Sequence, residues 1–209
     1  MALAAGRRSV IHLEVGEPDF STPQHITDAA FAAASAGWTK YSPNAGLPAL
    51  RQQVAVRASR HGNEPIVAEQ VVITTGAIGA LYSALMAVVD AGDEVLIPDP
   101  GWPNYEAIVH LAGAKAIRYQ EVASRGFLPN AAEIAGLITT RTKALLINTP
   151  GNPSGAVFPE RLMAEIGAIV RRTGIYLVSD EIYEDILFEN EHVSAAAFTP
   201  PDRVFIVSG

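Results

Sequence analysis

The chain has 209 residues, of which 49% are hydrophobic and 18% are charged, and its formal net charge at pH 7 is −7. These values predict a folded protein with a buried core and argue against a surface that binds nucleic acid or an anionic membrane. The sequence contains no cysteine, which excludes disulfides and thiolate metal sites and fits a reducing compartment. No stretch approaches the roughly 18 apolar residues of a membrane span, and the first residues do not follow the pattern of a secretory signal. We therefore expect a cytoplasmic protein with neither a nucleic-acid nor a membrane partner.

The first third of the chain predicts one strand and two helices. The run VIHLEV at residues 10–15 is typical of a short strand. A helix is expected to begin after Thr22, with Ser or Thr capping and proline in the first turn, and to end at Gly37. After a turn-rich loop, a second helix is expected between Leu47 and Ala58, where apolar residues line one face.

From residue 70 onward, strand-like runs alternate with helical segments. The expected strands are Val71–Thr74, Glu94–Ile97, Ala116–Tyr119, Ala144–Ile147, Tyr176–Ser179 and Val204–Val207. The clearest helical segments are Ala77–Val89, Tyr105–Leu111 and Pro159–Arg172. Continuous apolar strands separated by helices predict a mainly parallel sheet buried on both faces, that is, an α/β fold with three α/β/α layers. In such folds ligands bind outside the carboxyl ends of the strands.

A glycine loop follows the first of these expected strands. In VVITTGAIGAL, residues 71–81, the loop Thr75–Gly79 precedes an apolar helix, an arrangement that often binds a phosphate group. A dinucleotide fingerprint needs a third glycine and an acid ending the next strand, where Asp99 is followed by proline and glycine. The short-chain dehydrogenase pattern needs Tyr-x-x-x-Lys, and none of the six tyrosines has a lysine four positions later. These features argue against a nicotinamide cofactor.

Four further candidate residues follow expected strands: Trp102, Asn152, Asp180 and Tyr183. Each has a plain structural explanation, since a tryptophan can cover a sheet edge, an asparagine beside prolines forms turns, and an acid suits a helix N-terminus. Taken together with the glycine loop, however, they fit a ligand with a phosphate, a flat ring, a ring nitrogen and a ring oxygen. Pyridoxal phosphate (PLP) has all four features.

The acidic stretch at Asp180, Glu181, Glu184 and Asp185 also permits a metal site, because hard cations prefer such oxygen ligands. Against that interpretation, the five histidines are scattered and no complementary carboxylate motif occurs elsewhere. The sequence therefore favours a cofactor site over a metal site.

Several stretches resemble the class I/II aminotransferases of PLP fold type I, the family that includes aspartate aminotransferase. The matching stretches occur in family order and cover most of the chain: LEVGEPDFSTP (13–23), KYSPNAGLPALR (40–51), VVITTGAIGALYSAL (71–85), GDEVLIPDPGWPNY (92–105), NTPGNPSGAVF (148–158) and VSDEIYED (178–185). The resemblance implies a PLP-dependent enzyme that moves an amino group between an L-amino acid and a 2-oxo acid.

The resemblance also implies how the cofactor would be held. Backbone N–H groups of Gly76, Ala77 and Ile78 would bind its phosphate, and Trp102 would stack on its ring. Asp180 would pair with the ring nitrogen, and in this role it counts as catalytic. Family members usually carry a polar side chain where this chain has Ile78, so Ile78 offers only its backbone.

Further implied roles concern the ring oxygen, the substrate and a second subunit. Tyr183, the other expected catalytic residue, and Asn152 would hydrogen-bond the ring's 3′ oxygen. Asn152 and the backbone at Gly16 would seat the substrate carboxylate. Tyr41 would reach the phosphate of the neighbouring subunit, which implies a homodimer with shared sites.

The same resemblance divides the chain into residues 1–39, an N-terminal segment that is part of the small domain in the family, and residues 40–209, the major part of the PLP-binding large domain. The lysine that forms the Schiff base would follow Gly209, and the C-terminal small domain is expected to be absent, so the large domain is incomplete. The three lysines at positions 40, 115 and 143 do not match that lysine.

Two alternatives to an aminotransferase remain open from the sequence. The same cofactor site would serve another fold type I enzyme, such as a C–S lyase or a cyclopropane-forming synthase. The chain could also be a non-catalytic fragment that binds PLP at most non-covalently. An aminotransferase-like regulator is disfavoured, because no basic helix or winged-helix segment precedes the matching stretches.

Overall fold

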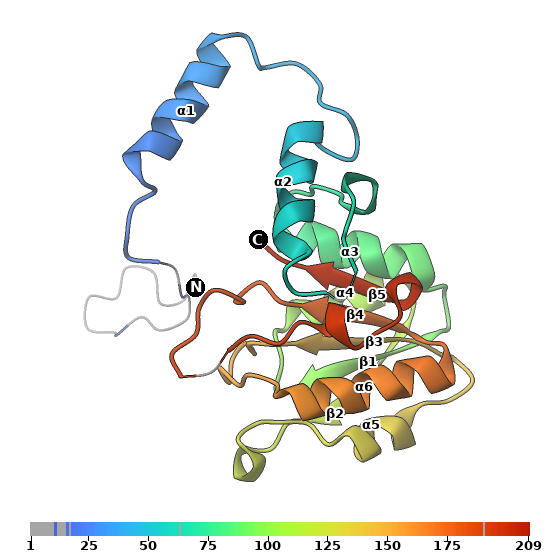
Figure 1. The fold of residues 1–209 in the computed structure, drawn as a ribbon. Coiled ribbons are helices and arrows are strands. Elements are labelled where there is room, and N and C mark those ends of the chain that lie inside the picture. Colours follow the sequence, from blue (N-terminus) through green and yellow to red (C-terminus); the bar gives the residue numbers. More distant parts are fainter. Residues whose placement is uncertain (1–10, 12–15, 17, 63, 190) are drawn as a thin grey trace. The chain divides into compact units, whose positions relative to one another are not determined.

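The computed structural model describes residues 11, 16, 18–62, 64–189 and 191–209 (Figure 1). The chain divides into two compact units, Met1–Ser42 and Pro43–Gly209, and each is described by itself. The strand expected at residues 10–15 lies outside the described residues except for Ile11, which belongs to no helix or strand.

The described part of the N-terminal unit contains one helix, α1 (Gln24–Ser35). The expected helix is confirmed, and Gly37 follows its end with a positive φ of 87°. The expected side-chain cap is wrong, because Pro23 occupies the N-cap position and no described side chain caps the first turn. Gln24 instead donates a hydrogen bond to Asp28 along the helix.

The C-terminal unit contains one sheet of five parallel strands in the order β2-β1-β3-β4-β5. The strands are β1 (Glu94–Asp99), β2 (Lys115–Gln120), β3 (Thr142–Asn148), β4 (Tyr176–Asp180) and β5 (Val204–Val207). The α-helices are α2 (Pro48–Ala58), α3 (Gly76–Val88), α4 (Asn104–Leu111), α5 (Ala131–Leu137) and α6 (Glu160–Thr173). Short 3₁₀ turns occupy Ala68–Gln70, Ala123–Arg125, Ala195–Ala197 and Pro201–Arg203.

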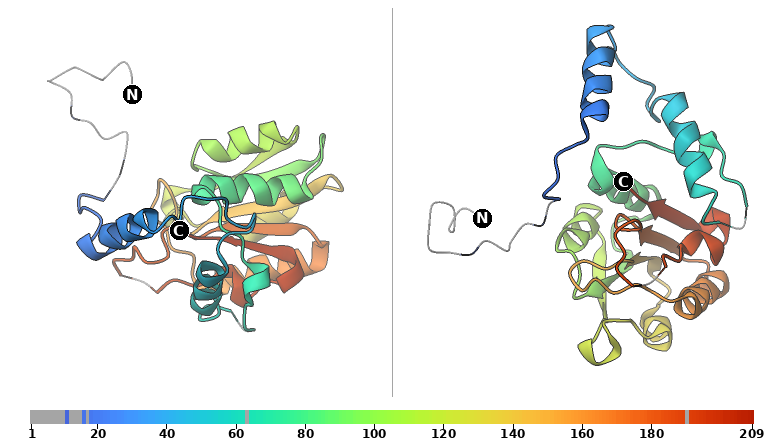
Figure 2. Two further views of the ribbon diagram at one scale, coloured as in Figure 1. Left: turned by 90° about the horizontal axis from the view of Figure 1, so that it is seen from above. Right: turned by 60° about the vertical axis from the view of Figure 1, so that its left-hand side comes forward.

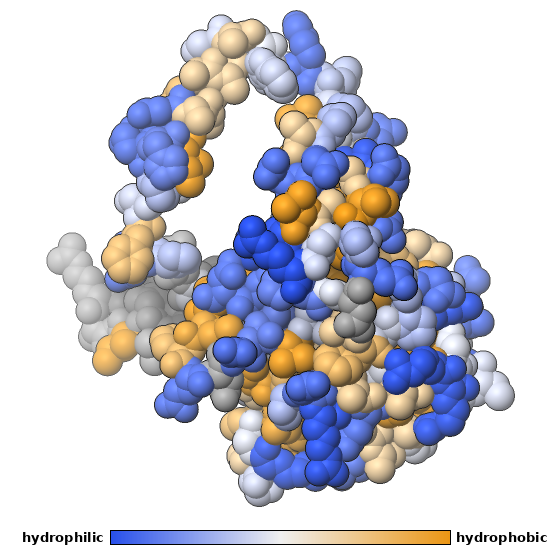
Figure 3. All heavy atoms as spheres, viewed as in Figure 1, coloured by the Kyte–Doolittle hydropathy of each residue, from blue (hydrophilic) through white to orange (hydrophobic). Residues whose placement is uncertain are grey.

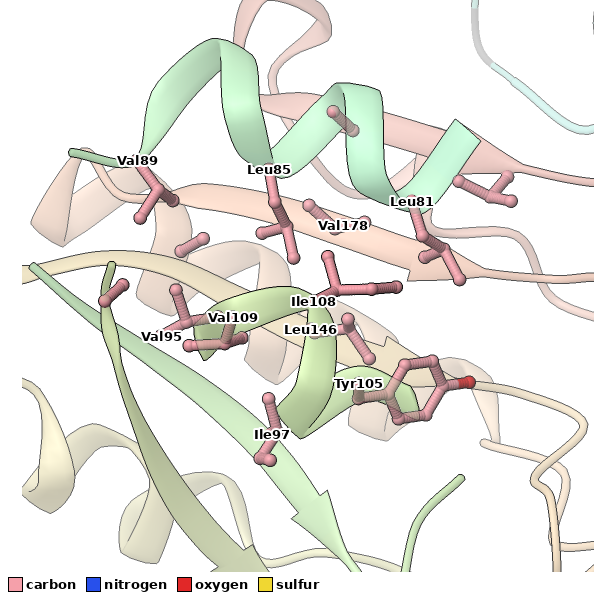
Figure 4. Close-up of a cluster of buried hydrophobic side chains, with 14 residues drawn as sticks. Leu81, Leu85, Val89, Val95, Ile97, Tyr105, Ile108, Val109, Leu146 and Val178 are labelled. Atoms are coloured by element: carbon pink, nitrogen blue, oxygen red, sulfur yellow. The ribbon is translucent and has the colours of Figure 1, made fainter. Parts of the chain in front are cut away.

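Helices cover both faces of this sheet, which confirms the expected α/β/α layers (Figures 1 and 2). On one face, α3 and α4 contribute residues such as Leu85 and Ile108 to a cluster with Val95 and Leu146 of the sheet (Figure 4). On the other face, α5 and α6 pack residues such as Ile166 against the opposite side of the strands. The inner strands β1, β3 and β4 are therefore buried on both faces, which explains their mostly apolar sequences, whereas the edge strand β2 is largely exposed.

The expected strand at Val71–Thr74 is wrong, because these residues belong to no helix or strand and do not join the described sheet. Its backbone bonds run elsewhere: the Ile73 N–H donates to the Ala45 carbonyl at 2.9 Å, and the Arg51 side chain donates to the Val71 carbonyl at 2.8 Å. A β-branched run favours extended backbone, but a strand also needs a neighbouring strand with which to pair.

The surface of the C-terminal unit mixes hydrophilic and hydrophobic residues across the face shown in Figure 3. Among the helices of the described ranges, none has the length and apolar character that crossing a membrane requires.

Candidate active site at the carboxyl edge of the sheet

Three neighbouring strands end at the same edge of the sheet. β1 ends at Asp99, β3 ends at Asn148, and β4 ends at Asp180, with Asn148 and Asp180 paired in register. The loops that follow these strands carry Trp102, Asn152 and Tyr183. The sheet order therefore brings together segments that are far apart in the sequence, as expected for the ligand-binding edge of a parallel sheet.

Asp180 is the buried acid of this edge, with 3% of its surface exposed. Its Oδ2 accepts a hydrogen bond from the Tyr105 hydroxyl at 2.6 Å, and its Oδ1 accepts one from the Ile182 N–H at 3.2 Å. Burial raises the pKa of the carboxyl above its usual value, and these two hydrogen bonds oppose the rise. Asp180 is thus a buried acid whose two described hydrogen-bond donors are both neutral.

Tyr105, in the first turn of α4, is a site residue that the sequence did not single out. Its side chain is 1% exposed, and burial and the adjacent Asp180 raise the pKa of its hydroxyl far above the usual value. The hydroxyl therefore remains a donor. The available signal was its place in the stretch PDPGWPNY, three residues after Trp102 and on a helix that opens at this edge.

Trp102 lies beside Tyr105, with the ring centroids 5.5 Å apart and the planes at 80°. The indole is partly buried and packs against the core cluster beneath α3 and α4. This edge-to-face contact holds the indole at the edge of the sheet.

Asn148 connects the loop after β3 to the end of β4. Its amide nitrogen donates to the Asp180 carbonyl at 3.0 Å, and its side-chain oxygen accepts from the Asn152 N–H at 2.6 Å. The Asn152 amide in turn lies 3.5 Å from the Tyr183 hydroxyl. The sequence analysis did not single out Asn148, and the structure shows that it links Asn152 to the strand that carries Asp180.

The glycine loop opens α3, which contacts β3, β4 and β5. Gly76 has a φ of +70°, which favours glycine, and a Cβ at this position would meet no atom within 4 Å, so the space beside it is open. The Gly76 N–H donates to the Thr74 carbonyl at 3.0 Å. The N–H groups of Ala77 and Ile78 lie in the first turn, where a helix provides them with no acceptor. This helix end suits an anion.

The two remaining candidates, Gly16 and Tyr41, belong to the N-terminal unit. Both are exposed, and Gly16 has no atom within 4 Å of the position of a Cβ. The site described above therefore consists of C-terminal-unit residues alone.

The acidic residues after Asp180 form a separate cluster with His192. Glu181, Glu184 and His192 offer ligand atoms within 4.8 Å of one another. Glu181, however, is already bonded by His192 at 2.8 Å, and Glu184 is paired with Arg57 at 2.7 Å. Asp180 does not join them, because Tyr105 binds it instead. In the described residues the cluster is ion-paired and hydrogen-bonded, and it contains two of the four acids that the sequence analysis considered as metal ligands.

The sequence matches the family "Aminotransferase class I and II" over residues 8–209. The chain belongs to this family. It is 39% identical to the aspartate/prephenate aminotransferase of Thermus thermophilus over 100% of this chain and 54% of the relative. It is also 39% identical to an arginine–pyruvate transaminase of Pseudomonas aeruginosa over 90% of this chain and 48% of the relative.

A solved structure of Thermus thermophilus aspartate aminotransferase superimposes with a TM-score of 0.90 at 38% identity, covering 93% of this chain and 51% of that one. This similarity confirms the fold type expected from the sequence. The chain spans about half the length of the relatives that it matches.

Proposed function

We propose that the protein carrying this chain is a PLP-dependent aminotransferase that moves an amino group between an L-amino acid and a 2-oxo acid. The observation that carries the proposal is Asp180, a buried carboxylate at the carboxyl end of β4 with its orientation held by two donors. The membership of the chain in the aminotransferase family supports the same chemistry.

The residues at this edge fit PLP by their chemistry. A buried carboxylate suits a protonated ring nitrogen, an indole suits a flat ring, and the open helix end at Gly76 suits a phosphate. When bound, PLP supplies the electron sink for a carbanion at the substrate α carbon.

Each residue then has a defined task. Asp180 holds the proton at the ring nitrogen, and Trp102 orients the ring. Asn152 and Tyr183 hold the ring oxygen, because their side chains lie together at 3.5 Å. Backbone N–H groups of Ala77 and Ile78 bind the phosphate, and the N–H of Gly76 joins them when it exchanges the Thr74 carbonyl for the phosphate.

The substrate carboxylate is assigned to Asn152 and to the backbone at Gly16. Tyr41 is assigned to the phosphate of a neighbouring subunit, and the protein is accordingly proposed to be a homodimer. Residues 1–39 are proposed to belong to the small domain and residues 40–209 to the large PLP-binding domain. The lack of cysteine supports a cytoplasmic location.

These residues are assigned only to the part that all amino-acid substrates share, so they do not select the substrate side chain. Relatives at equal identity bear the names aspartate/prephenate aminotransferase and arginine–pyruvate transaminase. We therefore propose the amino acid and 2-oxo acid pair as a class.

The test compares the protein, as its gene encodes it, with its Asp180→Asn variant. The parent protein is expected to bind PLP, followed by absorbance, and to transfer an amino group from a panel of amino acids to a 2-oxo acid. The variant should lose at least about 100-fold in turnover, because the neutral amide no longer stabilises a protonated ring nitrogen. Asp202→Asn, which removes a carboxylate that is 76% exposed, is the matched control and should leave turnover unchanged.

Two outcomes would contradict the proposal. Failure of the parent protein to bind PLP would exclude the cofactor. Release of a 2-oxo acid in the absence of any amino acceptor would instead assign a lyase reaction on the same site.

A further inference from the structure

We propose that Tyr105 is a positioning residue for Asp180: its hydroxyl keeps this buried carboxylate ionised and correctly oriented toward a protonated ring nitrogen. The inference rests on the proposed function and names a residue to which neither the sequence motifs nor the comparisons assign a role.

The geometry of the pair supports a fixed contact rather than a chance one. Tyr105 and Asp180 are 75 positions apart in the sequence, and their oxygens lie 2.6 Å apart with both residues almost fully buried. Tyr105 is anchored because α4 also buries Ile108 and Val109 in the core. In Figure 4 the Tyr105 ring lies at the border of this cluster, with its hydroxyl oxygen pointing away from the apolar side chains.

The orientation of Asp180 follows from its two donors. Tyr105 binds Oδ2 and the Ile182 N–H binds Oδ1, so the carboxylate cannot rotate without breaking one of these bonds. Each oxygen can accept a further hydrogen bond, because a carboxylate has about four acceptor positions. The carboxylate is therefore immobilised and can still accept a hydrogen bond from a ligand.

The surroundings show why a donor is needed here. Burial disfavours the charged form of Asp180, and the adjacent Glu181 adds a second negative charge. Two further tyrosines, Tyr119 and Tyr183, act on Tyr105 and bring no positive charge to the pair. Tyr105 and the single Ile182 N–H are the two groups that lower the pKa of Asp180. Removing the hydroxyl would shift the balance toward a neutral acid, which cannot stabilise a protonated ring.

Tyr105→Phe is the direct test, because it removes the hydroxyl and keeps the ring that packs against Trp102. Tyr119→Phe is the matched control. Tyr119 is also a tyrosine that is 1% exposed, and its hydroxyl donates at 3.0 Å to the Leu146 carbonyl instead of to Asp180. Each variant therefore loses one buried hydroxyl and one hydrogen bond.

The first measurement is the stability of the cofactor-free protein as a function of pH. The folded-state pKa of Asp180 is raised, so the folded protein keeps a proton that the unfolded chain releases, and stability falls as pH rises from the ordinary value through the raised value. In Tyr105→Phe that fall should continue to higher pH. In Tyr119→Phe the stability loss should be the same at every pH below the range where tyrosines titrate.

The second measurement compares two dissociation constants. One is that of PLP, and the other is that of an analogue in which a carbon atom replaces the ring nitrogen. Tyr105→Phe should weaken PLP by about 10-fold relative to Tyr119→Phe, since one pKa unit is a tenfold change, and should leave the analogue unaffected. An equal loss for both ligands, or identical behaviour of the two tyrosine variants in both measurements, would overturn the proposal. If no form of the protein binds PLP, the proposed function fails, and the pH dependence of stability still decides whether Tyr105 controls the charge of Asp180.

Discussion

Asp180 and Glu181 are neighbours in the sequence, yet they serve two different regions of the molecule. Asp180 is bonded by Tyr105 of α4, whereas Glu181 is bonded by Ser179, His192 and the Ala195 N–H. Consecutive residues at the end of a strand point to opposite faces of the sheet, so adjacent acids reach different partners. A run of acids such as DEIYED is therefore not one site.

The two regions also differ in how they accommodate a buried carboxylate. Around Asp180 the described donors are neutral, and the pKa of the acid is raised. Around Glu181 and Glu184 the described partners include an imidazole and a guanidinium. Asp180 therefore has no cationic partner among the described residues, whereas Glu184 pairs with Arg57 within the protein.

The largest expected effect distinguishes the two regions, because one substitution should lower stability and the other should lower activity. Glu181→Ala should cost about 3 kcal/mol of unfolding free energy, because it leaves buried His192 and Ser179 without their partner. Asp180→Asn should leave stability unchanged or raised, because it removes a carboxylate that burial disfavours, while it abolishes amino transfer. Denaturant unfolding and an amino-transfer assay of both variants check this; a stable Glu181→Ala protein would contradict it.

A third buried carboxylate, Glu121, sharpens the comparison because its Oε1 has no hydrogen-bond partner among the described residues. Burial raises its pKa to about 8. The folded protein therefore holds a proton that the unfolded chain releases, and stability should fall as pH rises from about 4.5 to about 8.

Glu121→Gln should remove this part of the fall in stability. The stability of the variant relative to the parent protein should therefore increase as the pH rises. Thermal unfolding of both proteins across that pH range is the measurement. Equal slopes for the two proteins would show that Glu121 does not hold a proton in the folded state.

A smaller effect is expected for Arg57, whose side chain is 44% exposed while it pairs with Glu184 and Asp185. Arg57→Met keeps the apolar stem and removes the charge, and should cost about 1 kcal/mol because the ion pair is partly solvated. Chemical denaturation at low and high salt checks the result. A loss as large as that of Glu181→Ala would show that Arg57, rather than His192, supports this cluster.

The smallest effect is expected for Asp185→Asn, which removes an acid that is 79% exposed at the end of the same stretch. The change in unfolding free energy should stay below about 0.5 kcal/mol, since exposed ion pairs contribute little. The unfolding free energy of Asp185→Asn is measured by denaturation together with that of Arg57→Met, and the two losses are compared. A larger loss would place Asp185 inside the cluster that contains Glu184.

Much of the fold was predictable because it depends on local patterns. Apolar runs such as Ala144–Ile147 become strands, and the amphipathic segment that forms α6 becomes a helix, since burial on one or both faces needs only the correct periodicity. The segment Val71–Thr74 shows the limit of this approach. Its composition favours a strand, but its hydrogen bonds go to Ala45 and Arg51, which no periodicity reveals.

The candidate site shows the same limit at the level of single side chains. Trp102, Asn152, Asp180 and Tyr183 were chosen because each follows a strand, and the structure brings their segments to one edge. Their assigned roles stay predictions. Tyr105 was missed because its place in PDPGWPNY, three residues after Trp102, does not reveal that its hydroxyl reaches Asp180, 75 positions later.

The sequence by itself determined the α/β class and the family, because apolar periodicity and the stretches that match the family are properties of the chain alone. Only the tertiary structure decided which acid has which partner. Tyr105 reaches Asp180 across 75 positions, and His192 reaches Glu181 across the loop that follows β4. These partners depend on the direction in which each side chain leaves a packed element, and that direction is set by the burial of all its neighbours at once.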